Sequence, residues 1–515
     1  MIILSAAESR ELDRLSSAKF GIPSFALMTR AGEAVARAVA RRFPDALGAG
    51  VLIAAGKGNN GGDGFVAARK LRQEGGEVRV ALCARAGELQ GDTARAHAEY
   101  IAARGTVIEV MDAHALDREG CGVVIDALLG TGLNAEVRSV MRAAITALNR
   151  RGRPIVAVDL PSGLDADTGV VMGVAVKAAA TVTFGCAKYA HLSYPGAALC
   201  GELEIADIGF PPAALAELKP AGRLIEAAEA AALLPSRAAD SHKGTYGHLL
   251  IVAGGRGKAG AAILAARGAL RSGAGLVTAA IPAGVAAIVA GAQAELMSEA
   301  MPERDGHFAA ASTIARLSGL IAGKSALIVG PGIGVNDDAR ALLSWLIREG
   351  AQPDRPLLID ADGLNALALI GATEVRSARG PVILTPHPGE MARLLGTTTE
   401  LVNANRIGAA HKLAEATGAH TLLKGARSVT VSPAGVVSVN SSGNPGMATA
   451  GMGDVLSGIV GALLAQGLEA GAALRLGVFV HGHAADRLAG RVGRFGYLAS
   501  DVATELPGAF ATIVR

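Results

Sequence analysis

The chain has 515 residues, too many for a single hydrophobic core, so two or more domains are expected. Half of the residues are apolar, 3% are aromatic and 68 are glycine, a composition that suits α/β domains with many tight turns. The net charge is only +3 and no run of Lys or Arg exceeds a pair, which argues against nucleic acid or an anionic membrane as the main partner.

Four cysteines lie in the first half of the chain: Cys83, Cys121, Cys186 and Cys200. They form no CxxC pair, so buried and reduced thiols are predicted in place of a disulfide framework or a zinc site. The N-terminus soon reaches charged residues and shows no cleavable leader, which predicts a cytoplasmic protein.

The first predicted elements are helices, then a strand and a glycine-rich loop. Apolar residues recur at helical spacing over residues 1–45 and predict an N-terminal helical arm. Residues 50–55 predict a short buried strand, residues 56–65 a glycine loop, and residues 66–72 a helix. A strand followed by a glycine loop and a helix is the arrangement that binds an anion at the N-terminus of the helix. Neither GxGxxG nor the P-loop pattern is present, so the loop is not a generic nucleotide motif.

Further strands alternate with helices and predict a Rossmann-like parallel α/β domain; they cover residues 78–84, 123–129, 154–160 and 180–184. Asp126 and Asp159 lie in the polar segments at the ends of two of these strands. Each aspartate alone could be a turn or cap residue. Because the carboxyl ends of parallel strands meet at one edge of a sheet, Asn60, Asp126 and Asp159 could converge on one pocket.

The segments NNGGDG (residues 59–64), DALLGTGL (126–133) and VDLPSGLDADTG (158–169) together resemble the NAD(P)H-hydrate epimerase family over residues 1–215. The resemblance implies that two segments bind a hydrated dinucleotide: Asn59, Asn60, Gly61, Gly62 and Asp63, and Gly130, Thr131, Gly132, Leu133, Asn134, Ala135 and Glu136. It also implies that Asp159 lies at the reacting nicotinamide, and that K⁺ is bound by Asn60, Asp126 and the neighbourhood of Ser162. Oxygen ligands of this kind suit a hard cation. Whether Asp159 transfers a proton or only orients the ring stays open at this point.

A change in composition marks a domain boundary near residue 220. Residues 211–235 are rich in Ala, Glu, Leu and Pro without a strand pattern, so we predict one domain over residues 1–220 and a second α/β domain over residues 221–515. Its predicted strands cover residues 249–253, 276–281, 326–329, 357–359 and 382–385, with a hairpin at 428–440. The uncharged stretch 274–294 is broken by proline and glycine, which favours a strand and a short helix over a membrane span.

Polar residues at the ends of these strands supply further candidates, each with a plain structural alternative. Residues 330–334 form a glycine loop that could be a simple turn, and Asp362 could cap a helix. His387 lies between two prolines, where ligand contact and a structural role are both open. Residues 424–428 offer Lys424 and Arg427 to a phosphate, or form a solvated turn.

The strongest signal in the second half is the string NPGMATAGMGD at residues 444–454, just before a helix predicted over residues 455–464. Gly451 and Gly453 allow the backbone to approach a ligand, and the free N–H groups of a helix start point at an anion. Asp454 in isolation would be a helix cap. Beside a bound phosphate it could be a general base, the pairing that phosphoryl transfer onto an alcohol requires.

The GMGD core resembles the anion hole of the ribokinase-like superfamily. The fuller string, with HKGTYGHLLIVAGG, GPGIG, DADGLNAL, TPHPGEMARL and LLKG before it, resembles ADP-dependent NAD(P)H-hydrate dehydratases over residues 242–465. The resemblance implies a ribokinase-like α/β domain with the hydrated nicotinamide near Ala261, Gly334, His387 and Asp454. It implies that the nucleotide phosphates lie near Lys424, Gly425, Ala426, Arg427, Ser428 and Gly453. Met452 departs from the sugar kinases, where a small residue is usual, and agrees with the dehydratase branch.

The two halves together are expected to form a bifunctional enzyme that repairs hydrated NADH and NADPH. The first would interconvert the epimers at nicotinamide C6; the second, with Asp454 as base, Mg²⁺ as cofactor and ADP as co-substrate, would dehydrate the S epimer and release AMP and phosphate. Two alternatives stay open: a kinase that releases a stable phosphoester, and a non-catalytic binding role for the first half. Small molecules are the expected partners, and helices rich in Ala and Gly favour a homo-oligomer.

Overall fold

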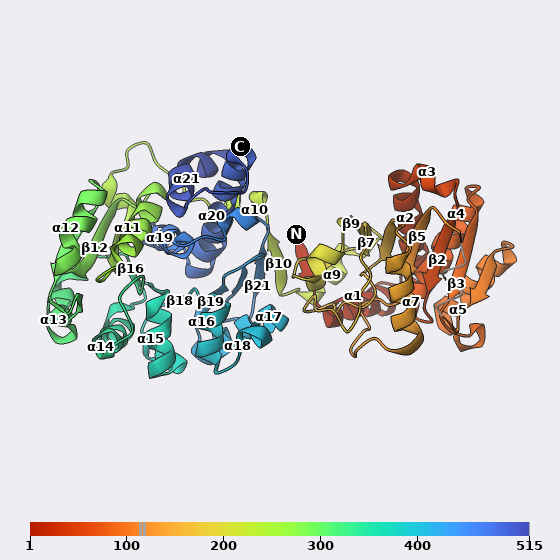
Figure 1. Ribbon diagram of the computed structural model, residues 1–515, viewed down its shortest axis with the longest axis horizontal. Coiled ribbons are helices and arrows are strands. Elements are labelled where there is room, and N and C mark those ends of the chain that lie inside the picture. The colour runs from red at the N-terminus through yellow and green to blue at the C-terminus, as the bar shows by residue number, and fades with distance from the viewer. Residues whose placement is uncertain (113–115, 117–119, 514–515) are drawn as a thin grey trace. The chain divides into compact units, whose positions relative to one another are not determined.

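The computed structural model describes residues 1–112, 116 and 120–513. The chain divides into two compact units, Met1–Gly222 and Arg223–Arg515 (Figure 1). No helix in the described part of the chain is both long and apolar enough to span a membrane. All four cysteines are buried and free, as the sequence predicted.

The first unit is built on a parallel sheet with the strand order β4-β3-β2-β5-β6-β7-β9. The strands are β2 (Val51–Ala55), β3 (Val78–Leu82), β4 (Thr106–Glu109), β5 (Val123–Ala127), β6 (Ile155–Val158), β7 (Ala180–Phe184) and β9 (Glu202–Ala206). Strands β2 and β5 are buried throughout, because a parallel sheet is covered on both faces. The direction of strand addition reverses between β2 and β5, and ligands bind at the carboxyl ends of strands beside such a point.

Helices cover both faces of this sheet. Alternate residues of β2 enter two different cores, as expected for a strand with side chains pointing to opposite faces. One core lies against α2 (Ser24–Arg42), α4 (Asn59–Gln73) and α5 (Gly91–Ala102). The other lies against α7 (Ser139–Arg150). The carboxyl edge of the sheet is therefore held rigidly from both sides.

Helix α4 begins at Asn59, earlier than the predicted start at residue 66, so NNGGDG forms the first turns of a helix and not a loop. A Cβ on Gly61 would lie 1.9 Å from the carbonyl oxygen of Gly56, so only glycine lets the helix approach the end of β2 this closely. The prediction was wrong here because glycine has a low helix propensity, and tertiary packing overrides that preference.

The predicted N-terminal arm consists of two helices, α1 and α2, preceded by a short strand. Strand β1 (Ile2–Leu4) pairs in parallel with β8 (Ala187–Lys188). Ser5 and Glu8 form a capping box at the start of α1 (Ala6–Ala18), which fixes where that helix begins. The shorter elements of the unit are α3 (Pro44–Leu47), η1 (Ala86–Glu88), η2 (Tyr189–His191), α8 (Gly196–Leu199) and α9 (Pro212–Leu218).

The second unit contains the strand order β13-β12-β11-β16-β17-β18-β19-β20-β21, parallel from β13 to β19 and antiparallel from there. The strands are β11 (His248–Val252), β12 (Leu276–Pro282), β13 (Met297–Met301), β16 (Ala326–Val329), β17 (Leu357–Ile359), β18 (Val382–Leu384), β19 (His420–Leu423), β20 (Val429–Val431) and β21 (Val437–Asn440). Strands β20 and β21 form the predicted hairpin. A separate small ribbon joins β14 (Glu303–Arg304) and β15 (His307–Phe308).

Two helical layers enclose this sheet (Figure 1). One layer contains α10 (Ala227–Leu233), α11 (Ala259–Arg271), α19 (Met452–Ala465), α20 (Ala470–Val492) and α21 (Ala499–Ile513). The other contains α13 (Ala310–Leu320), α14 (Asp337–Trp345), α15 (Asp362–Ile370), α16 (Pro388–Leu395), α17 (Thr399–Ala404) and α18 (Arg406–Thr417). The remaining elements are α12 (Ala283–Ala292), η3 (Lys243–Tyr246), η4 (Leu346–Gly350), η5 (Ala372–Ser377) and η6 (Pro445–Met447).

Two sequence-based expectations about strands have different outcomes. The uncharged stretch 274–294 contains β12 and α12, as predicted. Residues 211–235 were expected to lack strands, and this was wrong because they include β10 (Gly222–Ile225). This strand has only four residues. At its last residue, the carbonyl of Ile225 accepts a hydrogen bond from the hydroxyl of Ser441 at 2.6 Å. So short a strand leaves almost no periodicity to detect.

Candidate active sites

A cavity of about 1110 Å³ lies in the first unit, at the carboxyl ends of β2, β5 and β6. We call it the first-unit cavity. Its lining brings together most of the residues predicted to contact a dinucleotide: Asn59, Asn60, Asp63, Gly130, Thr131, Gly132, Leu133, Asn134, Ala135, Glu136 and Asp159. Gly61 and Gly62 do not line it; a side chain on Gly62 would lie 2.5 Å from Met28 Cε, inside the packing of α4. These two glycines therefore set the position of the helix.

Asp126 and Ser162 form a buried pair near the cavity wall. The hydroxyl of Ser162 donates to Asp126 Oδ1 at 2.6 Å, and its backbone N–H donates to Oδ2 at 2.8 Å. Burial raises the pKa of Asp126 to about 6, although these hydrogen bonds oppose the rise. The Asn60 Nδ2 is buried and has no hydrogen-bond partner among the described residues. The oxygen donors of Asn60, Asp126 and Ser162 have the chemistry that K⁺ prefers.

Asp159 follows β6 in an unusual backbone conformation. Its φ is +64°, in the left-handed region that few residues other than glycine adopt. Its Oδ1 accepts hydrogen bonds from Lys188 Nζ at 2.7 Å and from Thr183 Oγ1 at 2.9 Å. Burial would raise the pKa of Asp159, but the Lys188 ammonium and its hydrogen bond outweigh burial and lower it.

Two more carboxylates of the first-unit cavity have a raised pKa, in contrast to Asp159. Burial raises the pKa of Asp63 well above its ordinary value, and the charges of Asp159 and Asp13 raise it further. Loss of water around Asp13 raises its pKa to about 6. Around Asp159, the cavity thus combines a carboxylate whose pKa is lowered with two whose pKa is raised, a contrast that acid–base chemistry uses. Asp13 and Lys188 were missed from the sequence; the one signal for Lys188 was a charged residue within a run of small apolar ones.

The second site is organised around the start of α19. The helix begins at Met452, before the predicted residue 455, and Gly451 precedes it with φ +87°. No side chain caps this start, so its backbone N–H groups are available to an anion. Asp454 lies in the first turn and makes no capping hydrogen bond within the described residues, which weakens the cap interpretation. Burial, and then the charge of Asp360, raise the pKa of Asp454 to about 7.

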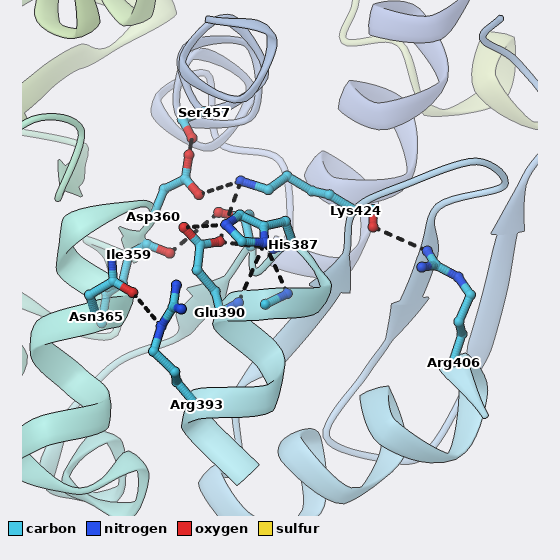
Figure 2. Close-up of polar contacts among 11 residues, drawn as sticks. Ile359, Asp360, Asn365, His387, Glu390, Arg393, Arg406, Lys424 and Ser457 are labelled. Atoms are coloured by element: carbon cyan, nitrogen blue, oxygen red, sulfur yellow. Dashed lines mark hydrogen bonds and ion pairs between the residues drawn. The ribbon is translucent and has the colours of Figure 1, made fainter. Parts of the chain in front are cut away.

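A buried polar cluster lies beside this turn (Figure 2). Lys424 Nζ donates to Asp360 Oδ1 at 2.7 Å, and the hydroxyl of Ser457 donates to Asp360 Oδ2 at 2.6 Å. Glu390 Oε2 lies 4.0 Å from the same ammonium. Burial opposes the charge of Lys424, yet Asp360 and Glu390 raise its pKa. The charge of Lys424 partly offsets the rise in the pKa of Asp454. This lysine therefore acts electrostatically on both the uncapped helix start and the carboxylates around it.

The loop 424–428 turns at Gly425 and Ala426, which are exposed, whereas Lys424, Arg427 and Ser428 are partly or fully buried. Ser428 Oγ donates to the carbonyl of Gly425 at 3.0 Å, and Arg427 Nη1 donates to the carbonyl of Ser441 at 2.8 Å. Arg406 Nη2 donates to the carbonyl of Lys424 at 3.1 Å. Sequence reasoning offered Lys424 and Arg427 as free cations, whereas here both already have partners.

His387 has a structural role that the sequence left open. Its Nδ1 accepts from the N–H groups of Gly389 at 3.0 Å and Glu390 at 3.4 Å, so it caps α16. Glu390 Oε2 in turn accepts from the His387 N–H at 2.8 Å. Burial lowers the pKa of His387, and the charge of Lys424 adds to this. The side chain of His387 remains half exposed, so its other face is open to a ligand.

The glycine loop at residues 330–334 lies beside the start of α11. Gly334 donates its N–H to Asp362 Oδ2 at 3.0 Å, and Lys258 Nζ donates to the same oxygen at 2.7 Å. A Cβ on Gly332 would lie 3.3 Å from the Cβ of Ala261. The structure therefore places Ala261 and this loop side by side, with Asp362 connecting the loop to Lys258.

Comparison with known proteins agrees with this division. Residues 24–190 match the family model of the YjeF-related protein N-terminus, and residues 249–508 match that of NAD(P)H-hydrate dehydratase. The bifunctional NAD(P)H-hydrate repair enzyme Nnr of Moorella thermoacetica is 42% identical over 98% of this chain and 96% of its own. The Escherichia coli enzyme of the same name is 35% identical over 97% of this chain and 92% of its own. A solved ribokinase-like superfamily protein from Enterococcus faecalis is 23% identical, with a TM-score of 0.50 over 57% of this chain and 96% of that one.

The fold and the two sites thus define an enzyme that joins a Rossmann-like parallel α/β domain to a ribokinase-like α/β domain. The relatives are similar over nearly the full length of both chains, and each half matches its own family model. The chain belongs to the family of bifunctional NAD(P)H-hydrate repair enzymes. The family, the fold class and the enzymatic function predicted from the sequence motifs are therefore confirmed.

Proposed function

We propose that residues 1–220 interconvert the R and S hydrates of NADH and NADPH at C6, and that residues 221–515 dehydrate the S hydrate at the expense of ADP. The observation that carries the proposal is the contrast between two aspartates. Asp159 is held ionised by a buried lysine, whereas Asp454 has a pKa of about 7 beside an uncapped helix start. Asp454 is thereby suited to take a proton from a hydroxyl at neutral pH, and Asp159 is available as an ionised carboxylate in the other unit.

In the first-unit cavity, we assign Asp159 to the reacting ring and the two lining segments to the rest of the dinucleotide. A cavity of about 1110 Å³ is large enough for such a ligand. Asn60, Asp126 and Ser162 would hold K⁺, which would supply a fixed positive charge at the edge of the cavity. The protein's own residues perform the proton transfer, with Asp159 as acceptor and Asp63, whose pKa is raised well above its ordinary value, as donor.

In the second unit, Asp454 removes the proton of the C6 hydroxyl. The hydroxyl oxygen attacks the terminal phosphorus of ADP at the same time, and AMP leaves. The N–H groups of residues 450–453 stabilise the negative charge that develops on the phosphoryl oxygens. The C6–O bond then breaks, phosphate leaves with the bonding pair, and the nitrogen lone pair forms the C6–N1 double bond. Loss of a proton from C5 restores the reduced nicotinamide.

Further residues complete the proposed second site. Ala261, Gly334 and His387 would contact the hydrated nicotinamide. The nucleotide phosphates would lie at Gly453 and along the segment Lys424, Gly425, Ala426, Arg427 and Ser428. Within the described residues no three acidic, His or Cys side chains gather to hold a metal ion. Mg²⁺ would be bound through the substrate phosphates with one or two carboxylates and its own waters.

Product analysis tests this function. The protein is incubated with S-hydrated NADH and ADP, and nucleotides and phosphate are separated at increasing times. We expect one AMP and one phosphate for each reduced nicotinamide formed, with no phosphorylated nicotinamide accumulating. A stable phosphoester as the end product would contradict the proposal and identify the second unit as a kinase. We also propose a homo-oligomer, because the abundance of Ala and Gly in the sequence would permit close packing of helices between subunits.

A further inference from the structure

The first-unit cavity contains a buried lysine that the function above does not yet use. We propose that Lys188 is a positioning residue for epimerisation, whose ammonium keeps the Asp159 carboxylate charged and fixed in one orientation. This inference rests on the proposed role of Asp159 as the group that accepts a proton from the substrate. Lys188 itself would act through Asp159.

The contacts of Lys188 form a closed triangle around the carboxylate. Its side chain is 2% exposed, and Nζ donates to Asp159 Oδ1 at 2.7 Å and to Thr183 Oγ1 at 2.9 Å. Thr183 Oγ1 in turn donates to the same Asp159 oxygen at 2.9 Å. A buried ammonium needs a charged partner and further hydrogen bonds to be tolerated, and this triangle supplies both. One side of the carboxylate is thereby fixed.

A second link fixes the backbone of Asp159. The Lys188 N–H donates to His191 Nδ1 at 2.9 Å, and His191 Nε2 lies 2.8 Å from the carbonyl oxygen of Asp159. Burial lowers the pKa of His191 to about 4, so the ring is neutral; since Nδ1 accepts, Nε2 carries the proton and donates. Lys188 thus holds Asp159 through its ammonium and, by way of His191, through its main chain. This double hold accounts for the tolerated φ of +64°.

The other charged groups facing this position explain why the cation matters. Asp13 on α1 and Asp63 on α4 line the same cavity, and burial raises the pKa of both. The charge of Asp159 raises the pKa of both carboxyls further, and the charge of Asp13 adds to the rise at Asp63. Three carboxylates therefore compete to ionise beside one buried ammonium. Lys188 is hydrogen-bonded to Asp159 alone among the three, so the negative charge is assigned to Asp159. Without Lys188, no cation would favour ionisation of Asp159 over ionisation of Asp13 or Asp63.

The test is the variant Lys188→Met in the full-length chain, assayed as interconversion of purified R and S hydrates. ADP is omitted, so that dehydration does not remove substrate. At neutral pH we expect kcat/KM to fall by about 10²-fold, because the carboxylate loses the contact that holds its orientation. The lost cation no longer favours the charged carboxylate, so the rising limb of the pH profile should move to higher pH by about 1–3 pH units. Lys188→Arg should restore part of the activity and move the limb back.

Matched variants separate positioning from a general structural effect. Lys177→Met makes the same chemical change at an exposed lysine of the same unit and should leave the profile unaltered. Thr183→Val removes the hydroxyl of the triangle but keeps the ammonium, so its limb should move less than that of Lys188→Met. This variant keeps the test informative if Lys188→Met fails to fold.

Two outcomes would overturn the inference, and they are distinguishable. If Asp159→Asn abolishes epimerisation while Lys188→Met and Thr183→Val keep the wild-type pH profile, Asp159 is the base but Lys188 does not position it. If Asp159→Asn leaves epimerisation intact, the proposed role of Asp159 fails and the inference fails with it.

Discussion

At the scale of single residues, Asp454 is the group that we propose as the base for dehydration. Asp454→Asn keeps the size of the side chain and removes the base, so we expect the ADP-dependent rate to fall by about 10²–10⁴-fold. Epimerisation should be unchanged, because its cavity lies in the other unit. The wild-type dehydration rate should rise with pH through about 7, since Asp454 accepts a proton only after losing its own. A pH-independent rate around neutrality would contradict the assignment.

Single residues also show where sequence patterns reach their limit. Asn60, Asp126, Asp159 and Asp454 could be selected from the sequence, because each lies in a recognisable motif at the end of a strand or the start of a helix. Lys188 could not, since its role depends on a contact with Asp159 across β7 and a loop. A motif reports local chemistry, whereas the partner that sets a pKa is fixed by tertiary structure.

The residues of the second site show the same limit. The sequence presented Lys424 as a phosphate-binding cation, but its bond to Asp360 is a long-range contact between β19 and β17 that no local pattern displays. His387 could have been expected to cap α16, because Glu390 follows three residues later as in a capping box. The flanking prolines are equally compatible with a rigid ligand-binding loop, so the sequence alone left both roles open.

At the scale of elements, the start of α19 is fixed by Gly451. Its φ of +87° costs a residue with a side chain about 1–2 kcal/mol, and a Cβ there would lie 2.5 Å from Leu264 Cδ1. In Gly451→Ala either Leu264 or the helix start must shift, and we expect reduced stability together with a loss of kcat for dehydration. Thermal unfolding and initial rates measure the two effects.

Gly467→Ala is the matched control for this element. Gly467 has a φ of +88°, but a Cβ there meets nothing within 4 Å. It should lose a similar conformational energy and retain kcat. If both variants retain kcat, then the geometry of the α19 start does not matter for catalysis as argued here.

Elements were predicted well where the sequence is apolar and regular. The central strands of both sheets and the hairpin β20–β21 correspond to the predicted segments within a residue or two at their ends. The starts of α4 and α19 were placed too late, in both cases because glycines occupy the first turn. Those glycines serve close packing and anion approach, which are tertiary requirements that helix propensity does not report.

At the scale of the whole molecule, two chemistries share one chain and one pool of substrate. Hydration at C6 gives two epimers, and a chiral site that dehydrates one of them leaves the other behind. An epimerase in the same chain makes the whole pool recoverable. The proposed catalytic groups lie in separate units, so each activity should be removable without loss of the other.

The most direct test follows the return of reduced-nicotinamide absorbance from an epimeric mixture of hydrated NADH with ADP, Mg²⁺ and K⁺. The wild-type chain should recover the whole pool, and Asp159→Asn should recover the S fraction quickly and the rest only at the spontaneous rate. Asp454→Asn should recover almost nothing, and mixing the two variants should restore full recovery. Fast and complete recovery by Asp159→Asn alone, or substantial recovery by Asp454→Asn alone, would contradict the account.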